Sequence, residues 1–329
     1  MMNSREIIQR TLDYDRPERV GWSFDVSDIA RCGHTVRTHA TDWERIYENR
    51  WRRTDEWGNV WGRLDPTSKG EVSEPILKSL DDADAYEFPD FSNRCDYELA
   101  ARQRRKHSEK FVLGMLPGFA FNIARKLLKL DEYLIALMLD RERISKLHDR
   151  IDRLCADMIC NYATAGLDGI FFCEDWGTQK QTLVSPEMWR NEFLPRFRRL
   201  CGAAHEAGLK VFMHSCGKIT AIIPDLIKAG VDALQFDQPR LHGIDTLAEL
   251  QNFGKITFWC PVDIQKTLPL QDEGVIRAQV QEMLDKLWKG RGGFVAGYYS
   301  GNPAIGLTEE VQGWACDEFV KCGRADRYD

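Results

Sequence analysis

Short apolar runs alternate with longer amphipathic stretches along the chain from residue 109 onward. The apolar runs are rich in β-branched and aromatic residues, which predicts strands. The predicted strands are 111–115, 168–175, 210–217, 232–237, 255–260 and 293–298. The amphipathic stretches between them predict helices. The predicted helices are 119–129, 131–165, 186–207, 219–229, 272–289 and a last one from about residue 308.

The part of the chain before residue 109 has a weaker pattern. Residues 4–12 predict a short helix, and residues 20–25 predict a first strand. Residues 27–50 are polar and predict irregular or helical structure. Residues 53–62 predict a small hairpin, because a Gly-Asn pair lies between two tryptophan-containing segments.

Repeated strand–helix alternation predicts parallel strands joined by helical crossovers. The number and even spacing of the strands favour an α/β fold of the closed (β/α)8 TIM-barrel type over an open doubly wound sheet. No glycine-rich phosphate loop of the GxGxxG or Walker type follows a strand, which disfavours a nucleotide-binding fold. We expect one domain, 1–329, in which 1–108 form an N-terminal extension with the first strand and 109–329 form the main barrel.

Composition and charge exclude several classes of function. Apolar residues make up 43% and charged residues 29%, as in ordinary globular proteins, and the net charge of −6 gives no basic field for nucleic acid or an anionic membrane. We expect no signal peptide and no membrane span. The ten cysteines lack framework spacing, so we expect reduced thiols and a cytoplasmic location.

The predicted strand at 210–217 carries the most informative pair of residues. His214 and Cys216 are two positions apart, and an extended chain turns alternate side chains to the same face, roughly 6.5 Å apart. An imidazole nitrogen and a thiolate on one face fit a tetrahedral zinc site. The alternative is a buried thiol beside a hydrogen-bonded histidine.

In a TIM barrel the active site lies at the carboxyl ends of the strands. Here those ends carry acids, soft metal ligands and a phenol, which together predict a polar cup for metal and substrate. Taken singly, an acid at such an end can also cap the next helix, and a cysteine can be a small core residue. The residues at these ends are Asp25, Glu174, Asp175, His214, Cys216, Asp237, Gln238, Cys260, Asp263 and Tyr299.

A zinc site with His214 and Cys216 needs a third protein ligand. Glu174 is the first choice because it comes from the preceding strand, and Cys260, two strands further on, is the second. The zinc would hold a thiol as thiolate, or polarise a leaving oxygen, at neutral pH. We expect Asp237, Asp263 and Glu174 to orient ligands or accept protons, and Tyr299 to hydrogen-bond the substrate.

These residues resemble the uroporphyrinogen decarboxylase superfamily, in particular its methyltransferase branch, over nearly the whole chain. The motifs that carry the resemblance are Arg16-Pro17-Glu18-Arg19-Val20, Asp55-Glu56-Trp57-Gly58, Glu174-Asp175-Trp176-Gly177, His214-Ser215-Cys216-Gly217, Asp263-Ile264-Gln265 and the stretch from Gly292 to Tyr299.

The resemblance implies a (β/α)8 barrel with a catalytic zinc, in which His214 and Cys216 match the family's His-x-Cys pair. It implies methyl transfer, in one-carbon metabolism, between a corrinoid (cobalamin-type) cofactor on a separate corrinoid protein and a small-molecule methyl donor or acceptor. Thiol-methylating members add a cysteine on the closing strand, but residues 297–301 here contain none. The residues expected to contact the cofactor are Asp25, Trp176, Gln179 and Gln238.

Two other functions remain open. Uroporphyrinogen decarboxylases carry an arginine-rich motif after the first strand, whereas residues 24–33 here hold one arginine and two acids, a poor match to a substrate with eight carboxylates. Decarboxylation of this tetrapyrrole is therefore the second hypothesis. A third is a non-catalytic binder of a corrinoid or tetrapyrrole, because several of the ten tryptophans lie near predicted strand ends.

Overall fold

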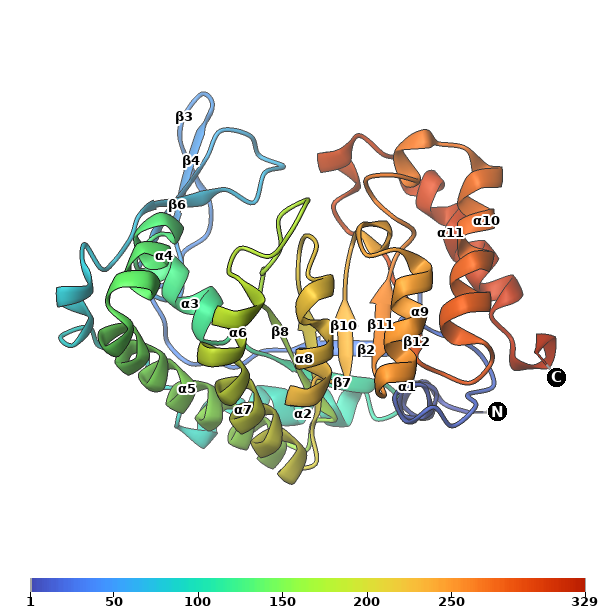
Figure 1. Ribbon diagram of the computed structural model, residues 1–329, viewed down its shortest axis with the longest axis horizontal. Helices are drawn as coiled ribbons and strands as arrows, with labels where there is room; N and C mark the ends of the chain where they lie inside the picture. The colour runs from blue at the N-terminus through green and yellow to red at the C-terminus, as the bar shows by residue number, and fades with distance from the viewer. Residues whose placement is uncertain (1, 329) are drawn as a thin grey trace.

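The computed structural model describes residues 2–328 and contains an eight-stranded parallel sheet that forms a (β/α)8 TIM barrel (Figure 1). The strands follow the order β1-β12-β11-β10-β9-β8-β7-β2. This confirms the predicted fold class, and all six strands predicted after residue 109 are present. The strand bounds are β1 Gly21–Trp22, β2 Ile29–Cys32, β7 Phe111–Met115, β8 Gly169–Cys173, β9 Lys210–His214, β10 Ala233–Gln235, β11 Thr257–Cys260 and β12 Phe294–Ala296.

The helices surround the barrel, apart from α1, which lies at its base (Figure 1). Two predicted helices are each divided: 131–165 at Asp140, and 186–207 at Phe193. Helices α2 and α9 were not predicted. The helix bounds are α1 Ser4–Asp13, α2 Glu98–Lys106, α3 Ala120–Leu127, α4 Leu130–Leu139, α5 Arg141–Thr164, α6 Pro186–Glu192, α7 Leu194–Glu206, α8 Ile223–Ala229, α9 Ile244–Phe253, α10 Glu273–Met283 and α11 Glu309–Cys322.

The first two strands, β1 and β2, lie at the two ends of the strand order and pair with different neighbours. β1 pairs with β12 and β2 pairs with β7, while Asp28 N donates to Trp22 O at 3.0 Å across the seam. The Asp28 carboxylate is fully buried and accepts hydrogen bonds from Arg19 and Trp22 N. The prediction of irregular or helical structure for 27–50 is therefore wrong at β2, which completes the barrel.

Side chains inside the barrel come from β2 and from β7 to β12, at alternate positions where a strand contributes more than one, as the period of two in a strand requires. They form a separate hydrophobic cluster with Ile8 and Leu12 of α1, so α1 fills the base of the barrel. The strand residues of this cluster are Ile29, Phe111, Leu113, Phe171, Phe212, Ala233, Trp259 and Val295, with Met115 and Cys173 packed against it.

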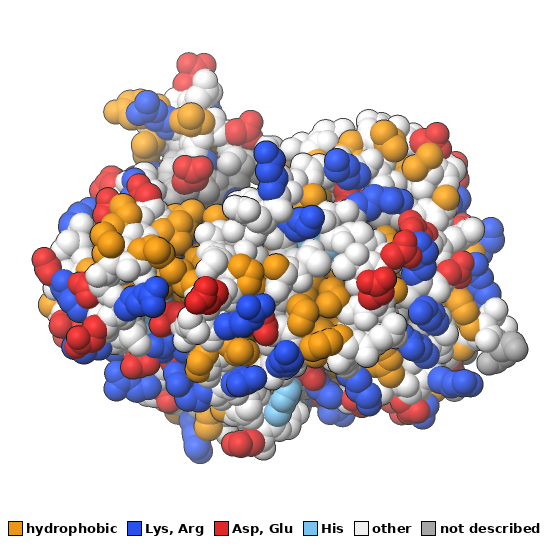
Figure 2. All heavy atoms as spheres, in the orientation of Figure 1, with side chains coloured by type: hydrophobic (Ala, Val, Ile, Leu, Met, Phe, Trp, Pro, Cys, Tyr) orange, Lys and Arg blue, Asp and Glu red, His pale blue; other side chains and the backbone are white. Residues whose placement is uncertain are grey.

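A four-stranded antiparallel sheet interrupts the chain between β2 and α2. Its strands are β3 Glu44–Tyr47, β4 Arg50–Thr54, β5 Val60–Arg63 and β6 Glu71–Glu74, in that order. The predicted hairpin is confirmed as β4 and β5. Figure 1 shows this sheet standing above α4 at the upper left, and Figure 2 shows hydrophobic side chains on its tip and over α4.

Arginine and tryptophan side chains hold the small sheet together. The Arg53 guanidinium lies 5.1 Å from the Trp43 ring centre and 5.0 Å from that of Trp61. The Arg63 guanidinium lies 4.2 Å from the Trp43 ring centre. Cation–π stacking therefore takes the place of a hydrophobic core in this sheet.

Among the described residues, no helix has the length and apolar character needed to cross a membrane.

Candidate active site

Three metal-binding side chains lie together at the carboxyl ends of β8 and β9. Asp175, His214 and Cys216 each offer one ligand atom, and these atoms lie within 4.8 Å of one another. His214 Nε2 is 3.2 Å from Cys216 Sγ and 3.5 Å from Asp175 Oδ1. The structure thus brings together the two predicted ligands, His214 and Cys216. The carboxylate beside them is that of Asp175 and not that of its neighbour Glu174, the predicted third ligand.

The alternation of side chains along β8 and β9 explains why these three residues meet. Phe171 and Cys173 point into the barrel from β8, so Asp175 continues the inward series. Phe212 does the same from β9, followed by His214 and then Cys216. Residues two apart share a face of a strand, so both series end at the same opening.

Glu174, the first choice as third ligand, belongs to the other series and points out of the barrel. Its Oε1 accepts hydrogen bonds from Phe119 N at 2.6 Å and from Asn122 N at 3.1 Å, at the start of α3. Burial raises the pKa of Glu174 to about 8, although these two N–H groups oppose the shift. Glu174 therefore anchors α3 to β8 and does not join the cluster.

Cys260 is also outside the cluster of Asp175, His214 and Cys216. Trp259 points into the barrel, so Cys260, one position later, faces the surrounding helices and is fully buried. Burial raises the pKa of its thiol, as expected for a core residue. The alternative of a small core cysteine describes its position better than the predicted ligand role.

Gln235, which we did not select from the sequence, orients the imidazole of His214. Its Oε1 pairs with His214 Nδ1, and its Nε2 donates to Asp237 Oδ1 at 2.9 Å. A glutamine carbonyl accepts, so His214 Nδ1 carries the proton and Nε2 presents its lone pair toward Cys216. Gln235 pairs in register with His214 and lies two positions from Asp237, so alternation along β10 was the available signal.

The charges around the cluster favour an ionised Asp175. Burial works to raise the pKa of Asp175, but His214, the Cys216 N–H and Arg125 together lower it. Arg125 Nη2 lies 3.3 Å from Asp175 Oδ2, and Cys216 N donates to Asp175 Oδ1 at 2.9 Å. The Cys216 residue is exposed, yet desolvation raises the pKa of its thiol to about 12, with Asp175 and Asp237 adding to the shift.

Two glycines bring the backbones after β8 and β9 into direct contact. A Cβ at Gly177 would lie 2.5 Å from Gly217 C, and a Cβ at Gly217 would collide with the Gly177 backbone. Gly217 also has φ +75°, which disfavours any side chain there. Gly177 N donates to Cys216 O at 3.1 Å, and Lys218 N donates to Thr178 O at 2.7 Å. These contacts fix Cys216 beside Asp175.

The remaining predicted catalytic residues differ in position. Asp263 is fully buried, and its carboxylate accepts from the backbone N–H groups of Arg240, Gln265 and Lys266, so it organises two loops. Asp237 is bound to Gln235 and lies beside the cluster. The charges of Asp237 and Cys216 reach the phenol of Tyr299: burial raises its pKa most, these two groups add to the rise, and Lys69 opposes it.

The four residues predicted to contact the cofactor do not form one group. Trp176 is fully buried, stacks on Phe121 with 3.9 Å between ring centres, and packs among other aromatic side chains, so it is a core residue. Gln179 and Asp25 are exposed, and Gln238 is half-buried at the start of a short turn before Leu241.

Three cations that we did not select from the sequence surround the same opening. Arg31 of β2, Lys69 of the β5–β6 loop and Lys126 of α3 all act on the Cys173 thiol and oppose the rise in its pKa caused by burial. We call this open end of the barrel the cup, bordered by Arg31, Cys173, Asp175, Cys216 and Asp237.

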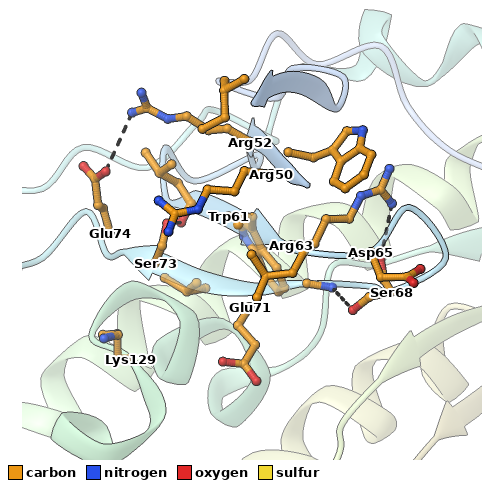
Figure 3. A pocket seen from close by; sticks show the side chains of 17 residues that line it. Arg50, Arg52, Trp61, Arg63, Asp65, Ser68, Glu71, Ser73, Glu74 and Lys129 are labelled. Carbon is orange, nitrogen blue, oxygen red and sulfur yellow. Dashed lines mark hydrogen bonds and ion pairs between the residues drawn. The ribbon is translucent and has the colours of Figure 1, made fainter. Parts of the chain in front are cut away.

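Two surface hollows lie away from the cluster. One of about 740 Å³ lies on the small sheet, and its lining includes Arg50, Arg52, Trp61 and Lys129 (Figure 3). The other, of about 640 Å³, is lined by residues 180–186 with parts of 218–221. Neither hollow includes Asp175, His214 or Cys216, so we locate the candidate site by its converging chemical groups.

The comparisons with known proteins agree with this architecture. The model of the family described as uroporphyrinogen decarboxylase (URO-D) matches residues 63–311. The chain therefore belongs to the uroporphyrinogen decarboxylase family, which confirms the resemblance predicted from its motifs. No curated protein matches the sequence.

Solved structures were compared with this chain at low sequence identity. A methyltransferase from Methanosarcina mazei is 14% identical, with a TM-score of 0.58 over 79% of this chain and 74% of that chain. A B12-independent methionine synthase from Shewanella sp. W3-18-1 is 14% identical, with a TM-score of 0.45 over 68% of this chain and 64% of that chain. The first of these similarities establishes the shared barrel fold.

Proposed function

We propose that this protein is a zinc-dependent methyltransferase that exchanges a methyl group with a corrinoid carried on a partner protein. The observation that carries the proposal is the convergence of Asp175, His214 and Cys216 at the carboxyl end of the barrel. Membership of the uroporphyrinogen decarboxylase family and the fold shared with a methyltransferase support it.

The donor set fits zinc. One imidazole nitrogen, one sulfur and one carboxylate oxygen are ligands that zinc accepts together, and three protein ligands are typical of a catalytic site. Asp175 takes the position for which we expected Glu174. When bound there, zinc would supply Lewis acidity, holding a thiol as thiolate or polarising a leaving oxygen at neutral pH.

The other residues of the site prepare these ligands. Gln235 holds the His214 ring with its Nδ1 proton directed away from the metal position, and Asp237 fixes the Gln235 amide in turn. Arg125 keeps Asp175 ionised by its charge and lies 3.3 Å from that carboxylate. The phenol of Tyr299, on which Asp237 and Cys216 act, would hydrogen-bond the substrate.

The experiment that tests the proposal measures zinc and methyl transfer in the same preparations. Purified protein should hold about one zinc ion per chain, and His214→Ala and Cys216→Ala should abolish zinc binding and methyl transfer to cob(I)alamin. Cys95→Ala, which removes another exposed cysteine, is the matched control and should change neither. Absence of zinc, or full methyl transfer by both variants, would refute the proposal.

Decarboxylation of a tetrapyrrole is the second candidate, because the matching family is described by that activity. It predicts loss of carboxylates from uroporphyrinogen with no dependence on zinc or on Cys216. Turnover of uroporphyrinogen by the Cys216→Ala variant would favour this activity over methyl transfer.

We also propose a cytoplasmic location, since all ten cysteines are free thiols.

A further inference from the structure

We infer that the cup binds a small substrate through a carboxylate held by Arg31, with Lys69 and Lys126 as supporting charges. If the proposed function is right, this substrate is the methyl donor or acceptor, and it is a carboxylic acid. Binding of the carboxylate does not depend on methyl transfer and is tested without it.

Arg31 is held in place by aromatic rings instead of by acids. Its guanidinium carbon lies 4.6 Å from the Phe171 ring centre and 4.9 Å from the Trp259 ring centre, inside the barrel opening. Trp259 is itself fixed, because its Nε1 donates to Ser23 Oγ at 2.9 Å. Cation–π contacts fix the position of a guanidinium but use none of its five N–H donors.

Within residues 2–328, the Arg31 side chain makes no hydrogen bond or ion pair, although the residue is exposed to the cup. Arg196, which is buried, is by contrast paired with acids: it contacts Asp149, Asp152 and Glu192. Arg53 of the small sheet also lies against two rings, but Arg31 does so at the open end of the barrel, beside Cys173 and Asp237. Its unused donors are therefore available to an acceptor that enters the cup.

Lys69 and Lys126 bring two more positive charges from other elements. Lys69 comes from the loop between β5 and β6, and among the charges that act on it are those of Cys216, Asp237 and Asp175. Lys126 comes from the last turn of α3. Neither side chain has a hydrogen bond or ion pair within the described part of the chain. Three elements distant in sequence thus converge as cations on one opening.

The acids of the cup balance these cations only in part. Asp175 and Asp237 bring two negative charges against the four positive charges of Arg125, Arg31, Lys69 and Lys126, and Asp175 is paired with Arg125. Asp237 acts on both Arg31 and Lys69, so the cup keeps a net positive charge that a bound anion would offset. The two rings flanking Arg31 restrict access to its planar edge, which suits a planar carboxylate.

The test uses two alkylating reagents that differ only in charge. Iodoacetate carries a carboxylate, iodoacetamide is neutral, and both transfer their carbon to a cysteine thiolate with release of iodide. The ratio of their rates at one cysteine cancels the fraction of thiolate, because both are measured on the same thiol at the same pH. Cys216 reports on the cup, and Cys95 and Cys160, which are also exposed, are internal controls.

The reactions are run on chelator-treated protein, and each cysteine is followed by peptide mass spectrometry. We expect the iodoacetate-to-iodoacetamide ratio to be about fivefold higher at Cys216 than at the two controls, because the carboxylate is concentrated beside the cations. Arg31→Met should bring that ratio down to the control value or below, since Asp175 then repels the anion. Arg31→Lys should restore part of it.

Lys69→Met protects the test against a folding defect in the Arg31 variants, because Lys69 lies in an exposed loop. It should lower the ratio at Cys216 about twofold and leave the ratios at Cys95 and Cys160 unchanged. A ratio at Cys216 equal to the controls, or one unaffected by both Arg31→Met and Lys69→Met, would overturn the inference.

The outcome is separable from that of the proposed function. Protein that holds no zinc and transfers no methyl group, yet favours iodoacetate at Cys216 through Arg31, would retain the carboxylate site and lose the methyltransferase. In active protein, Arg31→Met should raise KM for a carboxylate substrate at least tenfold with a smaller change in kcat. Inorganic phosphate that competes as well as acetate in the alkylation assay would count against a planar carboxylate site.

Discussion

The end of the barrel around β8 and β9 and the small antiparallel sheet are stabilised in different ways. At the barrel end, Gly177 and Gly217 bring two backbones into contact and hold Asp175 beside Cys216. In the small sheet, Arg53 and Arg63 stack on tryptophan rings, and the strands stand largely in solvent. The first region depends on the backbone, and the second depends on long side chains.

This difference indicates which region places the reacting groups and which adjusts their surroundings. Metal ligands must be positioned closely, so they are best carried by strand ends that cannot shift. A sheet held by exposed cation–π contacts has weaker constraints, since each contact is worth about 0.5–1 kcal/mol. The small sheet nevertheless supplies Lys69 to the cup. It therefore adds a positive charge beside ligands that are positioned by the barrel strands.

The strongest way to break the barrel end is Gly217→Ala. The new Cβ would collide with the Gly177 backbone at a φ of +75°, and we expect a loss of about 4 kcal/mol in the free energy of unfolding. Gly208→Ala is the matched control, because Gly208 has φ +80° with nothing near its Cβ, and it should cost about 1 kcal/mol. Chemical denaturation measures both, and equal losses would remove the role of the backbone contact.

The pH dependence of stability tests His242, which connects the segment after β10 to Thr220 in the segment after β9. His242 is buried, stacks on Phe236 and pairs with Thr220, and burial lowers its pKa to about 4. The unfolded chain takes up this proton near pH 6.5. Stability is thus full above pH 6.5 and falls as the pH drops toward 4, by about 3 kcal/mol. In His242→Asn this part of the pH dependence of the free energy of unfolding should vanish; an unchanged slope would contradict the assignment.

Gln235→Ala sharpens the comparison within the site. Without its amide, the His214 ring loses the partner of Nδ1, and we expect zinc affinity to fall about 10–100-fold. Gln265→Ala, an exposed glutamine, should leave affinity unchanged. Competition with a chromogenic chelator measures both variants. An affinity of Gln235→Ala within twofold of the parent would show that the ring needs no support from β10.

Arg63→Met tests the small sheet and should have the smallest effect. Loss of stacking on Trp43 should lower the free energy of unfolding by about 1 kcal/mol, with no change in bound zinc. Arg102→Met, at an exposed arginine of α2, should cost less than about 0.5 kcal/mol. Loss of zinc in Arg63→Met would mean that the two regions are more tightly connected than the contacts indicate.

Much of the fold could be predicted from the sequence because the barrel strands after residue 109 are short apolar runs between amphipathic helices. β2 was missed for a physical reason. Its sequence Ile29-Ala-Arg-Cys32 is only partly apolar, since Arg31 faces the cup, and it follows the polar pair Ser27-Asp28. Its place in the barrel depends on the buried Asp28 carboxylate, which binds Arg19 and Trp22 across the seam.

The candidate site was predicted in part. His214 and Cys216 were identified by their spacing along one strand, and the same rule applied to β8 selects Asp175, because it shares the inward face with Phe171 and Cys173. We chose Glu174 because it comes from the preceding strand, without asking which face of that strand it occupies. The position of Lys69 beside the cup could not be predicted. It depends on the orientation of the small sheet relative to the barrel, which residue spacing along the sequence does not determine.

Helix α1 has a consequence for access to the barrel. Ile8 and Leu12 fill the lower end of the barrel, so Asp175, His214 and Cys216 are approached from the opposite end, at the carboxyl ends of the strands. Under the proposed function, a corrinoid and a small molecule would both have to approach through this end. They would then bind one after the other, or from opposite sides of the same opening.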